Sequence, residues 1–62
     1  MNTLIIDAAS KKIFLMIIKI KNIYNVSHEN SKTNYEKLII LINDFLQKND
    51  LKTDKISKLY VN

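Results

Sequence analysis

The sequence contains no cysteine, glycine, proline, tryptophan or arginine, and it has one histidine. Without cysteine the chain forms no disulfide and no cysteine-ligated zinc site. Without glycine it has none of the glycine-rich loops that hold phosphate groups in nucleotide-binding proteins. Without arginine it lacks the side chain that reads guanine through two hydrogen bonds. His28 cannot build a metal cluster alone, so we expect neither a metal nor another cofactor.

The length and charge favour one small domain that needs further chain or a partner for its stability. The chain has 62 residues and a formal net charge of +4. A domain of this size buries only about 60% of its unfolded surface. Small domains without disulfides or metals usually rely on further chain or a partner. The lysines are scattered along the sequence, which is typical of a solvated surface rather than of a nucleic-acid site.

The longest apolar run, Ile13 to Ile18, is too short to cross a membrane. It contains six residues and is followed by Lys19. A transmembrane helix needs about 20 residues, and a signal peptide needs an apolar region of about 7–15 residues with a small-residue cleavage site. We therefore expect a cytoplasmic chain with no membrane contact, and a signal peptide is the minor alternative.

Three strands are expected in the first half of the chain, at about residues 3–7, 12–20 and 23–28. The first is a short β-branched run that ends in a polar turn segment. The second is apolar without alternation, which fits a strand buried on both faces, although a short buried helix has the same pattern. In the third, Tyr24 and Val26 alternate with polar residues, as on an edge strand with one solvent-exposed face.

One amphipathic helix is expected at about residues 34–48. Thr33 and Glu36 have the spacing of a capping box, with Thr33 as the N-cap residue. Asn49 suits the left-handed conformation that ends many helices. Residues 58–61 then predict a fourth strand. The expected fold class is therefore α/β, with a three-stranded antiparallel sheet, one amphipathic helix and a fourth strand in a single partial domain.

The apolar arc of this helix is wider than a single sheet contact requires. It spans roughly 160° at about 100° per residue, whereas a helix lying on a sheet needs a stripe of about 100°. One interpretation is core packing along the whole arc, and the other is a partner helix against one flank. Leu38, Leu41 and Phe45 form one flank of the arc, and Tyr35, Ile39 and Leu46 form the other, with Ile42 between them.

Asp7 and Ser10 lie between the first two expected strands. In one large class of phosphate-binding folds, this first hairpin holds a metal–phosphate contact. The alternative is that Asp7 caps the turn and needs no ligand. A hydrolase triad of Ser10 and His28 with Asp7 or Glu29 has no supporting spacing.

The order of these segments and three of their motifs resemble the start of the TsaB family, also called YeaZ. Members open with a sequence like ILAIDTS, and residues 3–9 here read TLIIDAA. A family helix reads like HSERLLPLIDELL, and residues 34–46 here read NYEKLIILINDFL. The family segment SDLDAIAV is similar to residues 53–61, TDKISKLYV. Asn34 and Ile40 stand where the family has His and Pro.

The resemblance covers the whole chain but only about the first quarter of such a protein, so it implies an N-terminal fragment. It implies the first part of an actin-like ATPase domain, which is ribonuclease H-like. The family's Gly-Pro-Gly-Ser-Phe loop would begin just after Asn62. Because Ala8 and Ala9 replace the Thr and Ser of the family motif, Asp7 and Ser10 would mark a degenerate phosphate site.

Family members are generally non-catalytic partners of a related catalytic subunit. Together with an ATPase, the two make N6-threonylcarbamoyladenosine next to the tRNA anticodon. The resemblance therefore implies a protein that is not an enzyme and that contacts the catalytic subunit and its ATPase. It implies tRNA contact at most indirectly, with a homodimer as a further option. The family pairs through its N-terminal helices, which agrees with a partner contact on the helix at 34–48. The residues expected at that contact are Tyr35, Ile39, Ile42 and Leu46.

The alternative function is an independent small basic module that binds RNA. The net charge of +4 supports it, as do Tyr24 and Tyr60, because tyrosines on strands can stack on bases. This alternative predicts a chain that folds alone and binds single-stranded RNA with strong salt dependence.

Overall fold

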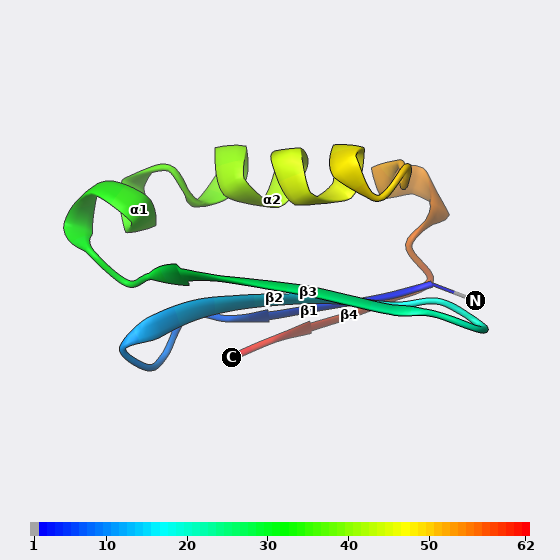
Figure 1. Cartoon of the computed structure of the whole chain (residues 1–62), viewed down its shortest axis with the longest axis horizontal. Helices are drawn as coiled ribbons and strands as arrows, with labels where there is room; N and C mark the ends of the chain where they lie inside the picture. The colour runs from blue at the N-terminus through cyan, green and yellow to red at the C-terminus, as the bar shows by residue number, and fades with distance from the viewer. Residues whose placement is uncertain (1) are drawn as a thin grey trace.

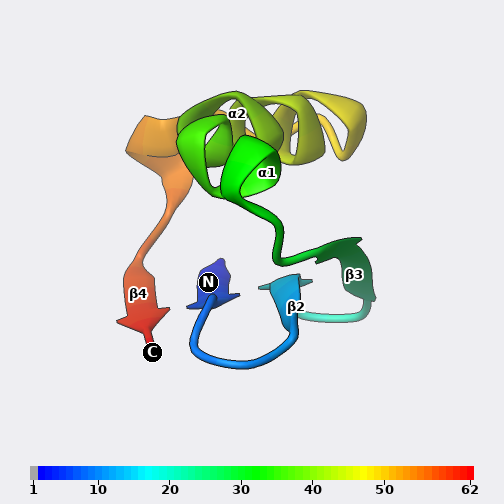
Figure 2. The ribbon, with the colours of Figure 1, turned by 90° about the vertical axis from the view of Figure 1, so that its left-hand side faces the viewer.

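The computed structural model of the chain describes residues 2–62, which form a four-stranded sheet with a helical layer on one face (Figure 1, Figure 2). The predicted fold class is confirmed: three antiparallel strands are followed by the helical segment and then by a fourth strand. The elements are β1 (Thr3–Asp7), β2 (Lys12–Ile18), β3 (Ile23–Glu29), α1 (Lys32–Glu36), α2 (Leu38–Lys48), the short 3-10 helix η1 (Thr53–Lys55) and β4 (Lys58–Val61).

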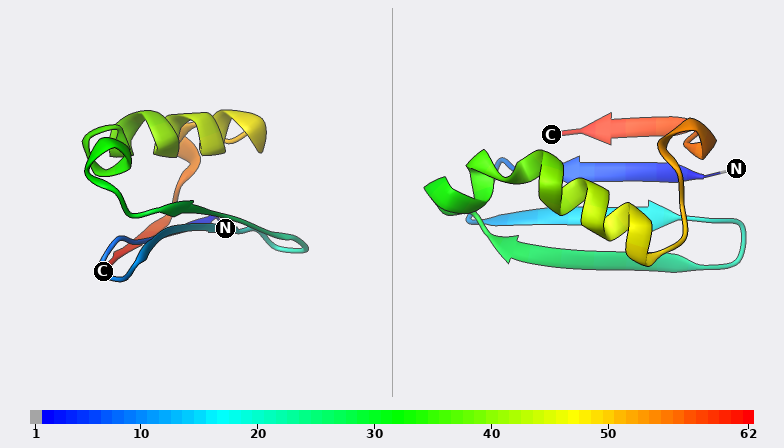
Figure 3. Two further views of the ribbon diagram at one scale, coloured as in Figure 1. Left: turned by 60° about the vertical axis from the view of Figure 1, so that its left-hand side comes forward. Right: turned by 90° about the horizontal axis from the view of Figure 1, so that it is seen from above.

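The strand order is β3-β2-β1-β4, so β3 and β4 are the two edges of this sheet. β2 is antiparallel to both β1 and β3, and β4 is parallel to β1. It follows that β1, β3 and β4 all run in one direction, as the arrows in Figure 3 show. The expectation of an edge strand at residues 23–28 is confirmed.

The core lies between the sheet and α2 and is built by alternate residues of the strands. Ile13, Leu15 and Ile17 of β2 are completely buried. They form one apolar cluster with Phe45 and Leu46 of α2. Because side chains of a strand alternate between its faces, this half of the apolar run faces the helix and the other half faces away.

The helical layer lies over one face of the sheet and leaves the other face uncovered within residues 2–62 (Figure 2). Burial alternates along β2, and Phe14 on this face is 38% exposed. The prediction of a second strand buried on both faces is therefore wrong for residues 2–62, since only one face is covered. The register places Ile5 between Met16 and Tyr60, so an apolar row crosses the uncovered face.

The helical segment begins earlier than predicted and is interrupted once. Ser31 is the N-cap residue, and its hydroxyl oxygen accepts a hydrogen bond of 3.1 Å from the backbone N–H of Asn34. Thr33 lies inside α1, so the predicted capping box with Thr33 as N-cap is wrong. At Lys37 the backbone leaves the α conformation, with ψ at 12°, and this separates α1 from α2.

The helix α2 ends in a Schellman motif. The N–H of Leu51 donates to the Leu46 carbonyl at 3.0 Å. The N–H of Asp50 donates to the Gln47 carbonyl at 3.1 Å. Asp50 takes the left-handed conformation with φ at 53°, whereas Asn49, the residue predicted for it, has φ at −101°. The motif turns the chain so that Leu51 returns to the core beside Leu46.

β2 is shorter and β3 is longer than the strands expected from the sequence. β2 ends at Ile18 rather than at residue 20, because the N–H of Lys19 donates to the Asn22 carbonyl at 2.8 Å and so closes the turn. β3 continues to Glu29, one residue beyond its expected end.

Candidate functional site

One flank of the helical segment exposes apolar side chains beside the core. Tyr35 of α1 is 61% exposed, and Ile39 of α2 is 74% exposed. Ile42 lies three residues after Ile39, on the same side of α2, and packs partly against the core. We call Tyr35, Ile39 and Ile42 the helix flank. These are three of the four residues expected at a partner contact.

Leu46, the fourth residue predicted for the partner contact, lies in the core. It is 3% exposed and belongs to the buried cluster with Phe45 and Leu51. The Schellman motif folds Leu51 back beside Leu46, so the C-terminal half of α2 buries a wider arc than its first half. In the fold, Ile39 is therefore exposed and can contact a partner, whereas Leu46 is buried in the core.

The turn after β1 is held by its own side chains. Oδ1 of Asp7 accepts a hydrogen bond of 3.1 Å from the N–H of Ala9 and one of 3.4 Å from the side-chain amide of Asn62. The hydroxyl of Ser10 donates to the Lys12 carbonyl at 3.1 Å. A bond from Asp7 to the N–H two residues later is the contact of a turn-capping aspartate.

Other groups of the same turn are also occupied within the chain. The N–H of Ala8 donates to the Asn62 carbonyl at 2.9 Å. The side-chain amide of Asn30 donates to the carbonyls of Ala8, at 2.9 Å, and Ser10, at 2.7 Å. Loops that bind phosphate do so with free backbone N–H groups. The geometry at Asp7 and Ser10 therefore favours a structural turn over a phosphate-binding one.

His28 is separated from the carboxylates of the hydrolase triad that the sequence does not support. It follows Val26 on the α2 side of β3, whereas Asp7 lies on the opposite face of β1, and Glu29 points away as the next strand residue. The triad is therefore not assembled. Within residues 2–62, no three side chains suited to metal binding gather at one point. Among the same residues, no helix combines the length and apolar character needed to cross a membrane.

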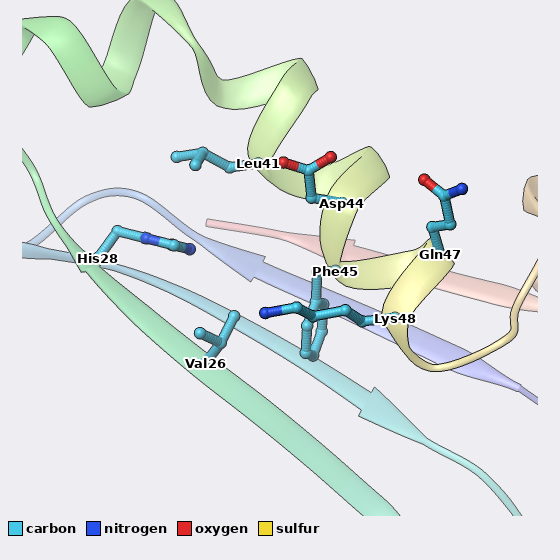
Figure 4. Close-up of a pocket in the computed structure, with 7 residues that line it drawn as sticks. All are labelled: Val26, His28, Leu41, Asp44, Phe45, Gln47 and Lys48. Carbon is cyan, nitrogen blue, oxygen red and sulfur yellow. The ribbon is translucent and has the colours of Figure 1, made fainter.

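Two open hollows lie side by side between β3 and α2, and we call them together the edge groove. The first has a volume of about 340 Å³, at the small end of the range of roughly 300–1,000 Å³ for ligand pockets. In Figure 4 the side chains of His28 and Lys48 extend toward each other near Val26. Both hollows share Val26, Phe45 and Lys48. Sequence periodicity does not predict the groove, because it depends on how far α2 lies from the edge strand.

The two tyrosines of the RNA alternative lie on opposite faces of the sheet. Tyr24 packs against the core under α2, and the ammonium of Lys19 lies 5.5 Å from the centre of its ring. Tyr60 is 56% exposed and pairs in register with Ile5 on the face away from α2. Bases cannot stack on both rings from one side, so the geometry does not favour the RNA alternative.

Solved structures match the fold, although the sequence itself matches no protein-family model and no curated protein. The chain is similar to YeaZ from Pseudomonas aeruginosa, with a TM-score of 0.85 at 8% sequence identity, over 98% of this chain and 29% of that one. It is also similar to a protein described as uncharacterised with similarity to peptidase YeaZ from Pseudomonas aeruginosa. That match has a TM-score of 0.86 at 8% identity, over 98% of this chain and 28% of the other.

This likeness concerns the fold alone, because the sequence identity is 8% in both matches. The chain spans less than a third of the length of either solved structure. YeaZ has an actin-like ATPase fold, and the four strands and helical layer of this chain correspond to part of it. The resemblance to the TsaB (YeaZ) family is thereby confirmed at the level of the fold.

Proposed function

We propose that the chain is a non-catalytic partner module that binds a related protein through the helix flank of Tyr35, Ile39 and Ile42. The observation that carries this proposal is the 74% exposure of Ile39 beside a packed core. Burying an isoleucine side chain is favourable by about 1.5–3 kcal/mol of free energy. A partner whose own apolar surface packs against the helix flank would gain this free energy on binding.

The turn at Asp7 supports a role without catalysis. The Asp7 carboxylate is bonded to Ala9 and Asn62, and the Ser10 hydroxyl is bonded to the Lys12 carbonyl rather than to an imidazole. A phosphate or a nucleophilic role at this turn would first have to replace these bonds.

The fold and the sequence motifs together support a more specific assignment. We propose that the partner is the related catalytic subunit of the cytoplasmic complex that makes N6-threonylcarbamoyladenosine next to the tRNA anticodon. In this role the chain is a partial α/β domain that holds the catalytic subunit, works beside its ATPase and contacts tRNA at most indirectly. A homodimer through the same helix flank is the alternative pairing. The match over 98% of this chain to YeaZ and the motif at residues 34–46 support the assignment.

The test is calorimetric titration of the chain with that catalytic subunit, using acidic substitutions at two consecutive isoleucines. Ile39→Asp buries an unpaired charge in the proposed contact, which costs about 3 kcal/mol or roughly 100-fold in affinity. Ile40→Asp is the matched control, because Ile40 is 58% exposed and lies about 100° further around α2, away from the sheet. We expect Ile40→Asp to bind like the parent chain and Ile39→Asp to bind at least about 100-fold more weakly.

Circular dichroism of both variants establishes whether each keeps the parent fold. If Ile39→Asp is folded and binds as tightly as the parent, the helix flank is not the contact. If the parent chain itself does not bind the catalytic subunit, the proposed function is wrong.

A further inference from the structure

The fold brings together five lysines that are scattered along the sequence. The β2–β3 turn, the segment between α2 and β4 and the start of β4 lie at one end of the molecule (Figure 1, Figure 3). The register agrees, because Thr3 at the start of β1 pairs with Ile18 before the turn and with Lys58 at the start of β4. We call the five lysines at this end the lysine cluster: Lys19, Lys21, Lys52, Lys55 and Lys58.

Two hydrogen bonds hold the segments of the lysine cluster together. The side-chain ammonium of Lys19 donates to the Asn49 carbonyl at 3.0 Å, which fixes the β2–β3 turn against the end of α2. The side-chain amide of Asn2 donates to the Lys55 carbonyl at 3.0 Å, which fixes η1 against the start of the sheet. The lysines therefore share one surface, and their relative positions are set by the fold.

Most of the net charge of the chain lies at this end. The lysine cluster is accompanied by two carboxylates, those of Asp50 and Asp54, so three of the four formal positive charges gather here. The other five lysines are almost balanced by the other four acidic residues. Burial of an unpaired ammonium group under an apolar layer is costly. The lysine cluster therefore suits an anionic partner rather than apolar packing.

An exposed isoleucine lies within the lysine cluster. Ile20 lies between Lys19 and Lys21 in the β2–β3 turn and is 83% exposed, more than any other large apolar side chain among residues 2–62. Ile23, three residues later, is 63% exposed. The turn extends furthest at this end of the molecule (Figure 3). An isoleucine gains little from a phosphate backbone, but it is stabilised at the boundary between lipid headgroups and acyl chains. The combination therefore favours a lipid surface over a nucleic acid.

We infer that the lysine cluster binds the surface of an anionic phospholipid bilayer, with Ile20 inserted between the lipid headgroups. The ammonium groups bind the negatively charged headgroups, and the isoleucine enters the boundary with the acyl chains. This contact needs no membrane-spanning helix. It differs from the expectation of no membrane contact, which was based on the length of the apolar run.

The bilayer contact and the helix flank lie in different parts of the molecule. Tyr35 belongs to α1, which lies at the end away from the β2–β3 turn (Figure 1). A chain bound to a bilayer through the lysine cluster would therefore keep its helix flank accessible to a partner. The cytoplasmic leaflet is negatively charged, so the contact is compatible with the proposed function but does not depend on it.

Co-sedimentation of the 62-residue chain with lipid vesicles tests the inference. Vesicles of phosphatidylserine and phosphatidylcholine in equal parts are compared with vesicles of phosphatidylcholine alone. We expect the chain to bind the mixed vesicles and not the phosphatidylcholine vesicles. Binding should weaken as salt is raised, because salt screens the charges of exposed lysines.

Two pairs of lysine substitutions separate the lysine cluster from a general effect of net charge. A lysine near an anionic bilayer strengthens binding about fivefold, so the double variant Lys52→Gln, Lys55→Gln should bind roughly 25-fold more weakly. The matched control, Lys32→Gln, Lys37→Gln, removes the same charge from α1 and its end. The control should bind within about twofold of the parent, since its lysines lie beyond the range of the screened surface potential.

Substitution of the exposed isoleucine tests insertion into the bilayer. Ile20→Ser should weaken binding to the mixed vesicles at least about tenfold. Ile40→Ser is the control, because Ile40 is 58% exposed on α2 and lies outside the lysine cluster, and it should bind like the parent. Circular dichroism establishes that each variant is folded. Lys21→Gln, Lys58→Gln replaces the first lysine pair if that variant does not fold.

Three results would overturn the inference. The first is a parent chain that does not distinguish the mixed vesicles from phosphatidylcholine vesicles. The second is an equal loss of binding in the two lysine double variants, which would mean that net charge alone attracts the chain. The third is a folded Ile20→Ser variant that binds like the parent, as expected of a surface that contacts only phosphate groups, such as those of a nucleic acid. None of these measurements involves the catalytic subunit, so each outcome leaves the proposed function untouched.

Discussion

The side-chain ammonium of Lys19 donates a hydrogen bond of 3.0 Å to the backbone carbonyl of Asn49 and thereby joins the β2–β3 turn to the end of α2. The last carbonyls of a helix carry partial negative charge, so a cation at this position is favourable. The same ammonium lies 5.5 Å from the ring centre of Tyr24. One lysine of a scattered set therefore has a defined structural role.

Replacing Lys19 with methionine should lower the free energy of unfolding by about 1 kcal/mol, because it removes the hydrogen bond to Asn49 but keeps an apolar stem. Urea unfolding followed by circular dichroism measures the change. Lys21→Met in the same turn is the control, and as a surface substitution it should change stability by no more than about 0.5 kcal/mol. Equal effects of the two substitutions would mean that the Lys19 contact does not stabilise the fold.

The hydroxyl of Ser31 should stabilise the N-terminus of α1 as its cap. Ser31→Ala removes the oxygen that accepts from the N–H of Asn34, and loss of such a cap costs about 1 kcal/mol. Thr33→Ala inside α1 should cost clearly less. Comparison of the two urea midpoints checks this, and a larger effect at Thr33 would restore the capping box expected from the sequence.

Asp50→Gly should stabilise the chain. Asp50 has φ at 53°, a conformation that costs a residue with a side chain roughly 1–2 kcal/mol and glycine almost nothing. The greater freedom of glycine in the unfolded chain offsets part of the gain, so we expect an increase of about 0.5 kcal/mol.

Asn49→Gly is the matched control for that substitution and should act in the opposite direction. Asn49 has φ at −101°, and its side-chain amide donates to the Phe45 carbonyl at 2.8 Å. Glycine loses this bond and relieves no strain. Thermal melting of the two variants should therefore give midpoints on opposite sides of the parent value.

Asn30→Asp should destabilise the turn that follows β1. The side-chain amide of Asn30 donates to the carbonyls of Ala8 and Ser10, and a carboxylate would present an acceptor to both. We expect a loss of about 2 kcal/mol in the free energy of unfolding. Asn25→Asp, an exposed change of the same kind in β3, is the control. If both variants unfold at the same urea concentration, Asn30 does not hold the turn.

The strands and the helix could be predicted from the sequence because side-chain periodicity is a local property. Tyr24 and Val26 alternate with polar neighbours, and this alone predicts an edge strand. Periodicity does not specify which part of a wide helical arc meets the sheet. It assigns Leu46 to a partner, yet Leu46 is 3% exposed because Leu51, beyond the end of the helix, folds back beside it.

The helix start and the β1 turn could not be read fully from local sequence because contacts from distant residues decide them. Ser31 and Thr33 are both suitable N-cap residues. The side chain of Asn34 bonds to the carbonyl at the end of β3, which fixes where the chain enters α1. In the turn after β1, the sequence around Asp7 fits either a residue that binds a ligand or a residue that caps the turn. The side-chain amide of Asn62 donates a hydrogen bond to Asp7, and these two residues are 55 positions apart.

The parallel pairing of β4 with β1 also sets an order of folding. The bond between Asp7 and Asn62 spans 55 positions, whereas Asp7 pairs with Phe14 across one short hairpin. Closing the longer loop costs about 2 kcal/mol more in chain entropy. We therefore expect the three-stranded meander to form first and β4 to dock last. In that interval β1, with its apolar Leu4 and Ile6, has a bare edge in addition to the edge of β3.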